Sequence, residues 1–260
     1  MTFTTIKLAY DGRTATMTFS RPEKRNALSV QMIDEIMAAL REVEQSDALA
    51  LIIAGSGKAF CAGMDLEELK SLTAKSPAEN VADSERMARF FRAIYEFPKP
   101  TIAAVNGAAM AGGAGIATMC DFTLAVAEAT FGYTEVRIGF LPAIVSSVLV
   151  WQVGHKVARD LLLTGRVFEA ADAKHMNLVN EIVSPNRLLP RARELAAQLQ
   201  ENSPAALRAT KKLLNNYLAK PLEQQIASAV QENAAIRQTE DFREGVASFL
   251  EKRKPNWSGK

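Results

Sequence analysis

Short apolar runs and longer amphipathic segments alternate along the first half of the chain. Four runs rich in β-forming or small aliphatic residues predict strands, at 14–20, 48–54, 101–105 and 122–127. Apolar residues at helical spacing follow Ser29, which suits an N-cap, and a second long helix is expected from Ser76-Pro77 to about Phe97. Strands that alternate with helices in this way predict stacked β-α units and a parallel sheet.

The pattern becomes mostly helical after Pro142. Helices are expected at 144–164 and 169–177, a short strand at 179–183, and helix again from about residue 188 onward. Pro204 is expected to begin one of the last helices, and Pro221 to separate it from the next. We therefore divide the chain into an α/β core, residues 1–190, and a helical C-terminal segment, residues 191–260, with no flexible linker between them.

Composition and charge narrow the possible functions. The chain has 260 residues, of which 31 are basic and 29 acidic, and a net charge of +2 argues against a nucleic-acid-binding surface. The N-terminus lacks the pattern of a secretory signal, and without an uninterrupted apolar run of about 18 residues a membrane span is not expected. Cys61 and Cys120 have no metal-ligand spacing, which favours two free thiols in a reducing cytoplasm.

Two segments rich in small residues, 58–66 and 106–115, are the first candidates for chemistry. Each is expected to leave the carboxyl end of a buried strand and enter a helix, which is where ligands bind in open α/β sheets. Free N–H groups near Met64 and Gly112 could form an oxyanion hole, in which each donor contributes about 3–4 kcal/mol. Alternatively, the glycines only allow close packing of helix on strand. They match no P-loop, dinucleotide fingerprint or nucleophile elbow.

Six segments resemble, in their order and spacing, the crotonase superfamily, which is also called the enoyl-CoA hydratase/isomerase superfamily. The three most specific are Lys-Ala-Phe-Cys-Ala-Gly-Met-Asp-Leu at 58–66, Ala-Ala-Val-Asn-Gly-Ala-Ala-Met-Ala-Gly-Gly at 103–113 and Ala-Thr-Phe-Gly-Tyr-Thr-Glu at 129–135. The others are Arg-Pro-Glu-Lys-Arg-Asn-Ala-Leu at 21–28, Leu-Thr-Gly at 163–165 and Phe-Leu-Glu-Lys-Arg-Lys-Pro-Asn-Trp at 249–257. The resemblance covers essentially the whole chain.

The resemblance implies a crotonase-like α/β fold, a spiral of ββα units whose helical C-terminal segment forms trimers, commonly dimers of trimers. It implies that the N–H groups of Met64 and Gly112 hold the thioester carbonyl of an acyl-CoA and that Glu135 transfers the proton. The implied CoA-binding residues are Lys24, Ala27, Ala62, Asp65 and Leu66, with Phe249 and Lys252 reaching the CoA of a neighbouring subunit. The alternative for that last pair is an ordinary helix end with solvated charges. The CoA thioester is the substrate, so no separate cofactor and no metal is expected.

Glu135 also fits this chemistry on physical grounds. A thioester enolate carries negative charge on its carbonyl oxygen, so preorganised donors lower the barrier to any proton transfer at Cα. A single carboxylate can supply or remove that proton if apolar surroundings raise its pKa, and its neighbours within 131–138 are largely apolar. Tyr133 and Arg137 could contact a polar acyl group such as a carboxylate, or could serve only in packing and ion pairing.

One position departs from the family pattern. Hydratases of this superfamily that use two glutamates carry the first one three residues after the oxyanion-hole glycine, and Gly115 stands there in this chain. Residues 134–143 resemble the methylglutaconyl-CoA hydratase-like branch, which also has glycine at this place. An enoyl-CoA hydratase that uses Glu135 alone, in fatty acid metabolism or branched-chain amino acid degradation, is therefore the leading hypothesis. A Δ3,Δ2-enoyl-CoA isomerase, which keeps only this glutamate, and a catalytically inactive CoA-binding protein are the alternatives.

Overall fold

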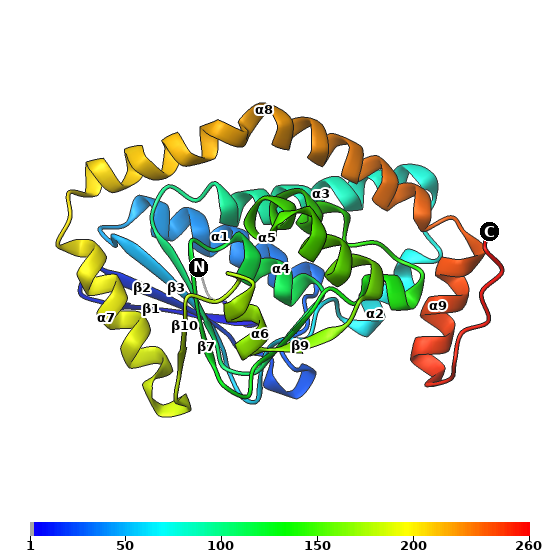
Figure 1. Cartoon of the computed structure of the whole chain (residues 1–260), viewed down its shortest axis with the longest axis horizontal. Helices are drawn as coiled ribbons and strands as arrows, with labels where there is room; N and C mark the ends of the chain where they lie inside the picture. The colour runs from blue at the N-terminus through cyan, green and yellow to red at the C-terminus, as the bar shows by residue number, and fades with distance from the viewer. Residues whose placement is uncertain (1–2) are drawn as a thin grey trace.

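The computed structural model describes residues 3–260, and its larger sheet has six strands in the order β1-β2-β3-β5-β7-β10. These strands are β1 (Ile6–Asp11), β2 (Thr14–Phe19), β3 (Ala50–Gly55), β5 (Thr101–Val105), β7 (Phe122–Val126) and β10 (Glu181–Val183). β1 and β2 form an antiparallel hairpin, and every other neighbouring pair is parallel. The predicted parallel sheet is therefore confirmed from β2 to β10 (Figure 1).

A second, smaller sheet was not predicted. Its strands, in sheet order, are β4 (Ala59–Cys61), β6 (Ala108–Met110), β8 (Thr130–Gly132) and β9 (Val167–Glu169). β4, β6 and β8 are parallel, and β9 pairs antiparallel with β8. Each strand has only three residues, which is too short for an alternation of polar and apolar residues to be recognised. Both glycine-rich segments thus contain a strand of the small sheet, and the loops that follow leave this sheet rather than β3 and β5.

Helices surround both sheets. They are α1 (Val30–Gln45), α2 (Leu66–Leu72), α3 (Pro77–Tyr95), α4 (Gly112–Met119), α5 (Ala143–Thr164), α6 (Ala170–His175), α7 (Leu188–Gln200), α8 (Pro204–Ile236) and α9 (Glu240–Glu251), with 3₁₀ helices η1 (Pro22–Lys24), η2 (Glu135–Ile138) and η3 (Pro185–Arg187). Two expected helix starts are confirmed. The hydroxyl of Ser29 accepts a hydrogen bond from the N–H of Met32 at 3.2 Å, and Ser76 and Glu79 form a reciprocal capping box.

Gly107 lets the turn before β6 approach the start of β4, and Gly113 lets α4 approach the end of β4. A Cβ at Gly107 would clash with the carbonyl oxygen of Lys58, and a Cβ at Gly113 would clash with that of Cys61. Neither backbone atom can move aside without breaking the sheet, so only glycine fits at these positions. The packing role considered for the glycines therefore applies to Gly107 and Gly113.

Helix α8 contradicts the predicted break at Pro221. It runs without interruption for 33 residues with Pro221 inside it, and Figure 1 shows it arching along one side of the molecule. A proline inside a helix removes one backbone hydrogen bond and bends the helix, at a cost of about 3 kcal/mol. Leu222, Ile226 and Val230 follow the proline and are buried in the main core. This tertiary packing offsets the cost and keeps the helix continuous.

The C-terminal helices share their core with the α/β part of the chain. The proposed boundary at residue 190 falls inside α7, whose Ala192 and Ala196 are fully buried in the main hydrophobic core. Helix α9 instead forms a small separate cluster in which Phe242 and Val246 pack with Leu69 and Leu72 of α2. The C-terminal segment therefore contributes directly to the walls of the region that carries Glu135.

Candidate active site

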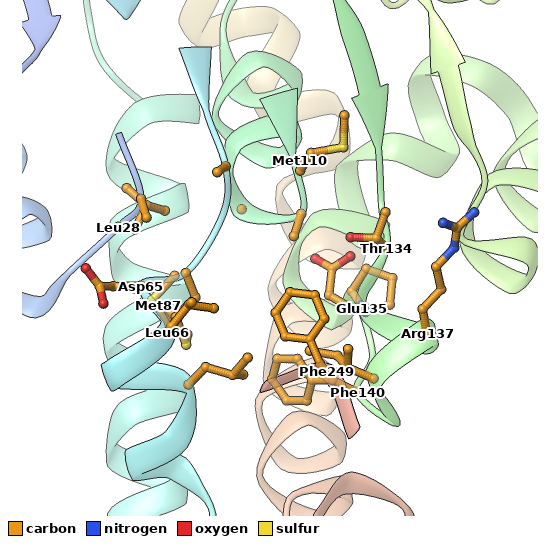
Figure 2. Close-up of a pocket in the computed structure, with 18 of the residues that line it drawn as sticks. Leu28, Asp65, Leu66, Met87, Met110, Thr134, Glu135, Arg137, Phe140 and Phe249 are labelled. Atoms are coloured by element: carbon orange, nitrogen blue, oxygen red, sulfur yellow. The ribbon is translucent and has the colours of Figure 1, made fainter. Parts of the chain in front are cut away.

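A cavity of about 800 Å³ lies where the small sheet meets α2, α3, η2 and α9. Figure 2 shows two groups of lining side chains that face each other, with Leu28, Asp65, Leu66 and Met87 on one side and Glu135, Phe140 and Phe249 on the other. Of the ten predicted site residues, all except Lys252 line this cavity. The fold thus brings together side chains that are more than 200 residues apart in the sequence.

Met64 and Gly112 follow two adjacent strands of the small sheet. Met64 lies beyond β4 and forms a parallel bridge with Leu28, and Gly112 is the first residue of α4, just beyond β6. The bridge is held by two hydrogen bonds of Leu28, from its N–H to Gly63 at 2.7 Å and to its carbonyl from Asp65 at 2.9 Å. Within residues 3–260, neither the N–H of Met64 nor that of Gly112 donates to a protein acceptor. Two free backbone donors are therefore present on residues of the cavity wall.

The backbone at Ala111 fixes the direction of the Gly112 donor. Ala111 has φ 47° and ψ −117°, a conformation that a residue with a side chain rarely adopts and that costs about 1–3 kcal/mol. Its N–H donates to the carbonyl of Gly132 at 2.7 Å, and its own carbonyl accepts from Gly115 at 2.9 Å. Because the Ala111 carbonyl and the Gly112 N–H belong to one planar peptide, these bonds set the orientation of both.

Glu135 begins η2 and places a buried carboxylate oxygen at the cavity. Its Oε2 atom is buried and has no hydrogen-bond partner in the described part of the chain. Burial raises the pKa of Glu135 to about 7, and a hydrogen bond from its own backbone N–H opposes this only in part. The expected elevation of the pKa is therefore present, and the group can change its protonation state near neutral pH.

The family follows from comparison with known proteins. Residues 11–260 match the family described as enoyl-CoA hydratase/isomerase. The chain belongs to this family. The crotonyl-CoA hydratase of Syntrophomonas wolfei is 34% identical to this chain over 263 residues, which cover 100% of both chains. A Thermus thermophilus protein assigned provisionally as an enoyl-CoA hydratase is 44% identical over 247 residues, which cover 95% of this chain and 98% of that protein. The crystal structure of an enoyl-CoA hydratase/isomerase from Xanthobacter autotrophicus matches with a TM-score of 0.89 at 30% identity, over 97% of this chain and 98% of that chain.

Apolar side chains close the place where two-glutamate members of the family carry their first glutamate. A Cβ at Gly115 would lie 2.7 Å from Val145 Cγ2 and 2.8 Å from Phe91 Cε1. Phe91 and Val145 are both buried and line the cavity. Position 115 therefore lacks not only a carboxyl group but also the space for one.

Asp65 is a structural carboxylate at the edge of the cavity. Its Oδ2 atom pairs with Arg21 Nη2 at 2.7 Å, and its Oδ1 atom accepts from the N–H of Glu67 at 3.1 Å, which caps α2. Burial acts to raise the pKa of Asp65, but these two hydrogen bonds outweigh it and hold the pKa below its ordinary value. Asp65 is therefore ionised and already engaged, and it fixes the start of α2 beside Met64.

The other residues expected to contact CoA lie along the rim of the cavity. Lys24 and Leu66 are exposed, Ala62 is half-buried, and Ala27 is buried. The N–H of Ala62 donates to the carbonyl of Arg25 at 3.0 Å, which holds the η1 turn against the small sheet. The Nζ atom of Lys24 lies 3.8 Å from Oε1 of Glu67. Both side chains are exposed, so this ion pair contributes little to the stability of the fold.

The end of α9 reaches the cavity of its own chain. Phe249 is exposed and lines the cavity of its own chain in the same group as Glu135, and its expected contact with the CoA of a neighbouring subunit stays a prediction. Lys252 caps α9 in a left-handed conformation and is not among the lining residues. The next residue, Arg253, does line the cavity and pairs with Glu244 at 2.8 Å.

The two residues considered for a polar acyl group have different environments. Tyr133 is 2% exposed, and its hydroxyl group shares a hydrogen bond of 2.7 Å with Thr118, so its role is packing. Arg137 is exposed at the edge of the cavity, and Figure 2 shows its side chain extending away from the carboxylate of Glu135.

Sequence reasoning missed Asn233 and Arg237, which are buried and line the cavity. A signal for them existed. Leu222, Ile226 and Val230 form the core-facing stripe of α8, and Asn233 and Arg237 continue it at helical spacing. Two polar residues on the buried face of a helix mark a site that packing alone does not explain.

The remaining reactive side chains play no part in the cavity. Cys61 and Cys120 are free and buried, and burial raises the pKa of each thiol to about 12, so neither is a thiolate at neutral pH. His155 and His175 are exposed on α5 and α6. Among residues 3–260, no group of three or more His, Cys, Asp or Glu side chains could hold a metal ion, and no helix could span a membrane.

Proposed function

We propose that this protein is an enoyl-CoA hydratase that adds water to the C2–C3 double bond of a 2-enoyl-CoA, with Glu135 as its single proton-transferring carboxylate. The observation that carries the proposal is this carboxylate, whose Oε2 atom is buried without a hydrogen-bond partner beside the cavity and whose pKa is about 7. The similarity to the crotonyl-CoA hydratase of Syntrophomonas wolfei supports hydration as the reaction.

In the proposed mechanism, the N–H groups of Met64 and Gly112 bind the thioester carbonyl oxygen. Their lack of a protein acceptor supports this role, because such donors are available without breaking another bond. Negative charge develops on the carbonyl oxygen as the enolate forms, so each fixed donor would stabilise the transition state by about 3–4 kcal/mol. The backbone conformation of Ala111 would keep the Gly112 donor in place during the reaction.

Glu135 would act first as a base and then as an acid. As carboxylate it takes a proton from a water molecule while the water oxygen bonds to C3 and the C2–C3 π electrons move into the thioester, which gives the enolate. The protonated Glu135 then donates the same proton to C2, and the products are a 3-hydroxyacyl-CoA and the original carboxylate. Because one group handles both steps from one position, hydroxyl and proton would add to the same face of the double bond.

The rim of the cavity would bind the CoA portion. Exposed Lys24 would supply positive charge for phosphate groups, and small side chains at Ala27 and Ala62 would leave room for the adenine-bearing part of the molecule. Leu66 and Phe249 would cover the pantetheine arm from opposite sides, as Figure 2 suggests by their arrangement. Lys252 would contribute charge from just outside the cavity. The CoA thioester is the substrate, and no separate cofactor enters this mechanism.

We also propose that the protein self-associates through its C-terminal helices. Exposed apolar residues on α8, Leu213, Leu214 and Tyr217, support self-association through the helical segment 191–260, as a homotrimer or a dimer of trimers. Light scattering of the purified protein would distinguish monomer, trimer and hexamer.

Two buried free thiols support a reducing compartment such as the cytoplasm, and the resemblance of residues 134–143 supports a place in fatty acid or branched-chain amino acid breakdown.

Product identification tests the proposed function directly. The protein is incubated with a trans-2-enoyl-CoA and, separately, with the trans-3-enoyl-CoA of the same length, and the products are identified by mass spectrometry and chromatography. A 3-hydroxyacyl-CoA with added mass of water, formed from the 2-enoyl substrate, supports hydration. Conversion of the 3-enoyl to the 2-enoyl substrate with no added water would instead assign the isomerase, which the closed space at Gly115 also permits. Binding without turnover of either would assign a CoA-binding protein.

A further inference from the structure

Thr134 precedes η2 and does not use its hydroxyl group to cap that helix. A threonine at an N-cap position usually accepts a hydrogen bond from a backbone N–H two or three residues later. The hydroxyl group of Thr134 makes no such bond, and within residues 3–260 it makes no other hydrogen bond either. The side chain is half-buried and lines the cavity. Its donor and its acceptor are therefore both available to a bound molecule.

Packing fixes the direction of this hydroxyl group. A Cβ at Gly132 would lie 3.0 Å from the Thr134 methyl carbon, so the methyl group occupies the space that this glycine leaves open. The N–H of Arg137 donates to the carbonyl of Thr134 at 3.0 Å and holds the backbone. Because a β-branched side chain has few allowed rotamers, the place of the methyl group also sets that of the hydroxyl group. Figure 2 shows the hydroxyl oxygen directed toward the carboxylate of Glu135.

Thr134 and Glu135 stand apart from the other polar side chains of the cavity wall. Six polar or charged side chains line the cavity without being exposed, those of Asp65, Thr134, Glu135, Asn233, Arg237 and Ser248. Four of them form hydrogen bonds with other residues, namely Asp65, Asn233, Arg237 and Ser248. The Thr134 hydroxyl group and the Oε2 atom of Glu135 have no such partner in the described chain. Two neighbouring residues thus present unpaired oxygens to one part of the cavity.

Hydration needs more than a base, because the attacking water molecule must also be held in the right direction. A water molecule with one hydrogen bond can rotate about it, whereas two hydrogen bonds fix its orientation. A carboxylate at position 115 cannot supply the second bond, since Phe91 and Val145 close that place. The hydroxyl group of Thr134 is the remaining unengaged group on the same wall as the carboxylate.

We propose that Thr134 is a second catalytic residue, whose hydroxyl oxygen accepts a hydrogen bond from the water molecule that adds to C3. This inference rests on the proposed hydratase function. One hydrogen of the water faces Glu135, the other faces Thr134, and a lone pair of the oxygen faces C3. As the O–C3 bond forms, the first proton passes to Glu135 and the C2–C3 π electrons move into the thioester. The second proton stays on the new 3-hydroxyl group, and Thr134 gains and loses none.

Replacement of the hydroxyl group tests this contact. Thr134→Val has nearly the same shape, so we expect kcat for a trans-2-enoyl-CoA to fall by about 10- to 100-fold while KM stays within about threefold. Thr134→Ser keeps the hydroxyl group and should retain kcat within about threefold. Because no capping bond is lost, the denaturation midpoint of Thr134→Val should match wild type. Thr16→Val, at a half-buried position of β2 outside the cavity, is the control. Wild-type kcat in Thr134→Val would overturn the inference.

Proton exchange at C2 separates loss of the water contact from displacement of Glu135. With a saturated acyl-CoA in D2O, Glu135 removes a C2 proton, exchanges it with solvent and returns deuterium, and no water adds to C3. Mass spectrometry should show exchange in Thr134→Val within about threefold of wild type although hydration falls, whereas Glu135→Gln should lose both. Equal losses of exchange and hydration in Thr134→Val would contradict the water contact.

The wild-type protein distinguishes failure of this inference from failure of the proposed function. If the wild type exchanges C2 protons but forms no 3-hydroxyacyl-CoA from the 2-enoyl substrate, the hydratase function is wrong and the role of Thr134 in it is wrong too. If the wild type hydrates this substrate and Thr134→Val hydrates it equally fast, the hydratase function stands and only the role of Thr134 is wrong.

Discussion

The backbone of Gly245 in α9 lies directly against the carbonyl group of Ile138, the last residue of the 3₁₀ helix that Glu135 begins. A Cβ at Gly245 would overlap the Ile138 carbonyl, and a Cβ at Gly139 would overlap the carbonyl of Asp241 from the other side. Gly139 also has φ +65°, which favours glycine. The C-terminal helix and the catalytic segment are therefore in backbone contact, and the position of Glu135 depends on residues more than 100 positions later in the chain.

This contact predicts that Gly245→Ala impairs both folding and catalysis. The added methyl group meets backbone atoms, which cannot rotate away, so we expect a loss of about 1–3 kcal/mol in the free energy of unfolding. A displacement of η2 by about 1 Å would lower kcat by about 100-fold. Denaturant unfolding and initial rates check both effects, and Arg243→Ala, at an exposed position of the same helix, is the control. Wild-type rates in Gly245→Ala would show that α9 does not position Glu135.

Replacement of the carboxylate tests the assigned base. Glu135→Gln keeps the size of the side chain but cannot accept a proton, so we expect kcat to fall by about 100- to 10,000-fold. Affinity for a saturated acyl-CoA, measured by calorimetry, should stay within about threefold because Glu135 makes no ion pair that binding would need. Glu128→Gln, an exposed glutamate just before β8, is the matched control and should behave as wild type. Near-normal turnover in Glu135→Gln would remove Glu135 from the mechanism.

The raised pKa of Glu135, about 7, predicts the pH dependence of hydration. The reaction begins with the carboxylate form, which accepts the proton of water. The fraction in this form falls about tenfold for each pH unit below 7, so kcat/KM should fall in the same proportion on the acid side and level off above about pH 8. Initial rates from about pH 5 to about pH 9 measure this profile. A profile that stays level down to about pH 5 would mean that the carboxylate titrates near its ordinary value.

The elements with strong local signals were predictable from the sequence, and those set by distant contacts were not. Ser29 and Ser76 predict where their helices begin because the hydrogen bonds of an N-cap form within one turn of the chain. The three-residue strands of the small sheet exist only through pairing with each other, and Pro221 stays helical only because the residues after it are buried. Nine of the ten residues that the motifs predicted for the site line the cavity. Arg237 was missed because its importance comes from burial, which appears only when α8 packs over the cavity.

The raised pKa of Glu135 also makes the stability of the folded protein depend on pH. Glu135 has a higher pKa in the folded state, about 7, than its ordinary value of 4.5, so the folded state binds more protons between these two values. Stability is therefore highest, with respect to this group, below about pH 4.5 and decreases as the pH rises to about 7. Glu135→Gln lacks this dependence and should be more stable than wild type at pH 8, by up to about 3 kcal/mol. Melting temperatures of both proteins across this range test it. A constant difference at every pH would contradict the burial of an ionisable carboxylate.

A glutamate at position 115 should not create a two-carboxylate hydratase by itself. The Cβ of any residue there would lie 2.7 Å from Val145 and 2.8 Å from Phe91, and a carboxyl group would also enter an apolar region without a partner. We expect Gly115→Glu to lose more than about 3 kcal/mol of stability and to be less active than wild type. Gly115→Ala introduces the clash without the charge and should lose about 1–3 kcal/mol, so the difference between the two variants measures the cost of the carboxyl group. Combining Gly115→Glu with Val145→Ala makes room and should recover part of the stability, which denaturant unfolding would reveal. If Gly115→Glu alone folded normally and hydrated faster than wild type, Phe91 and Val145 would not be what closes this position.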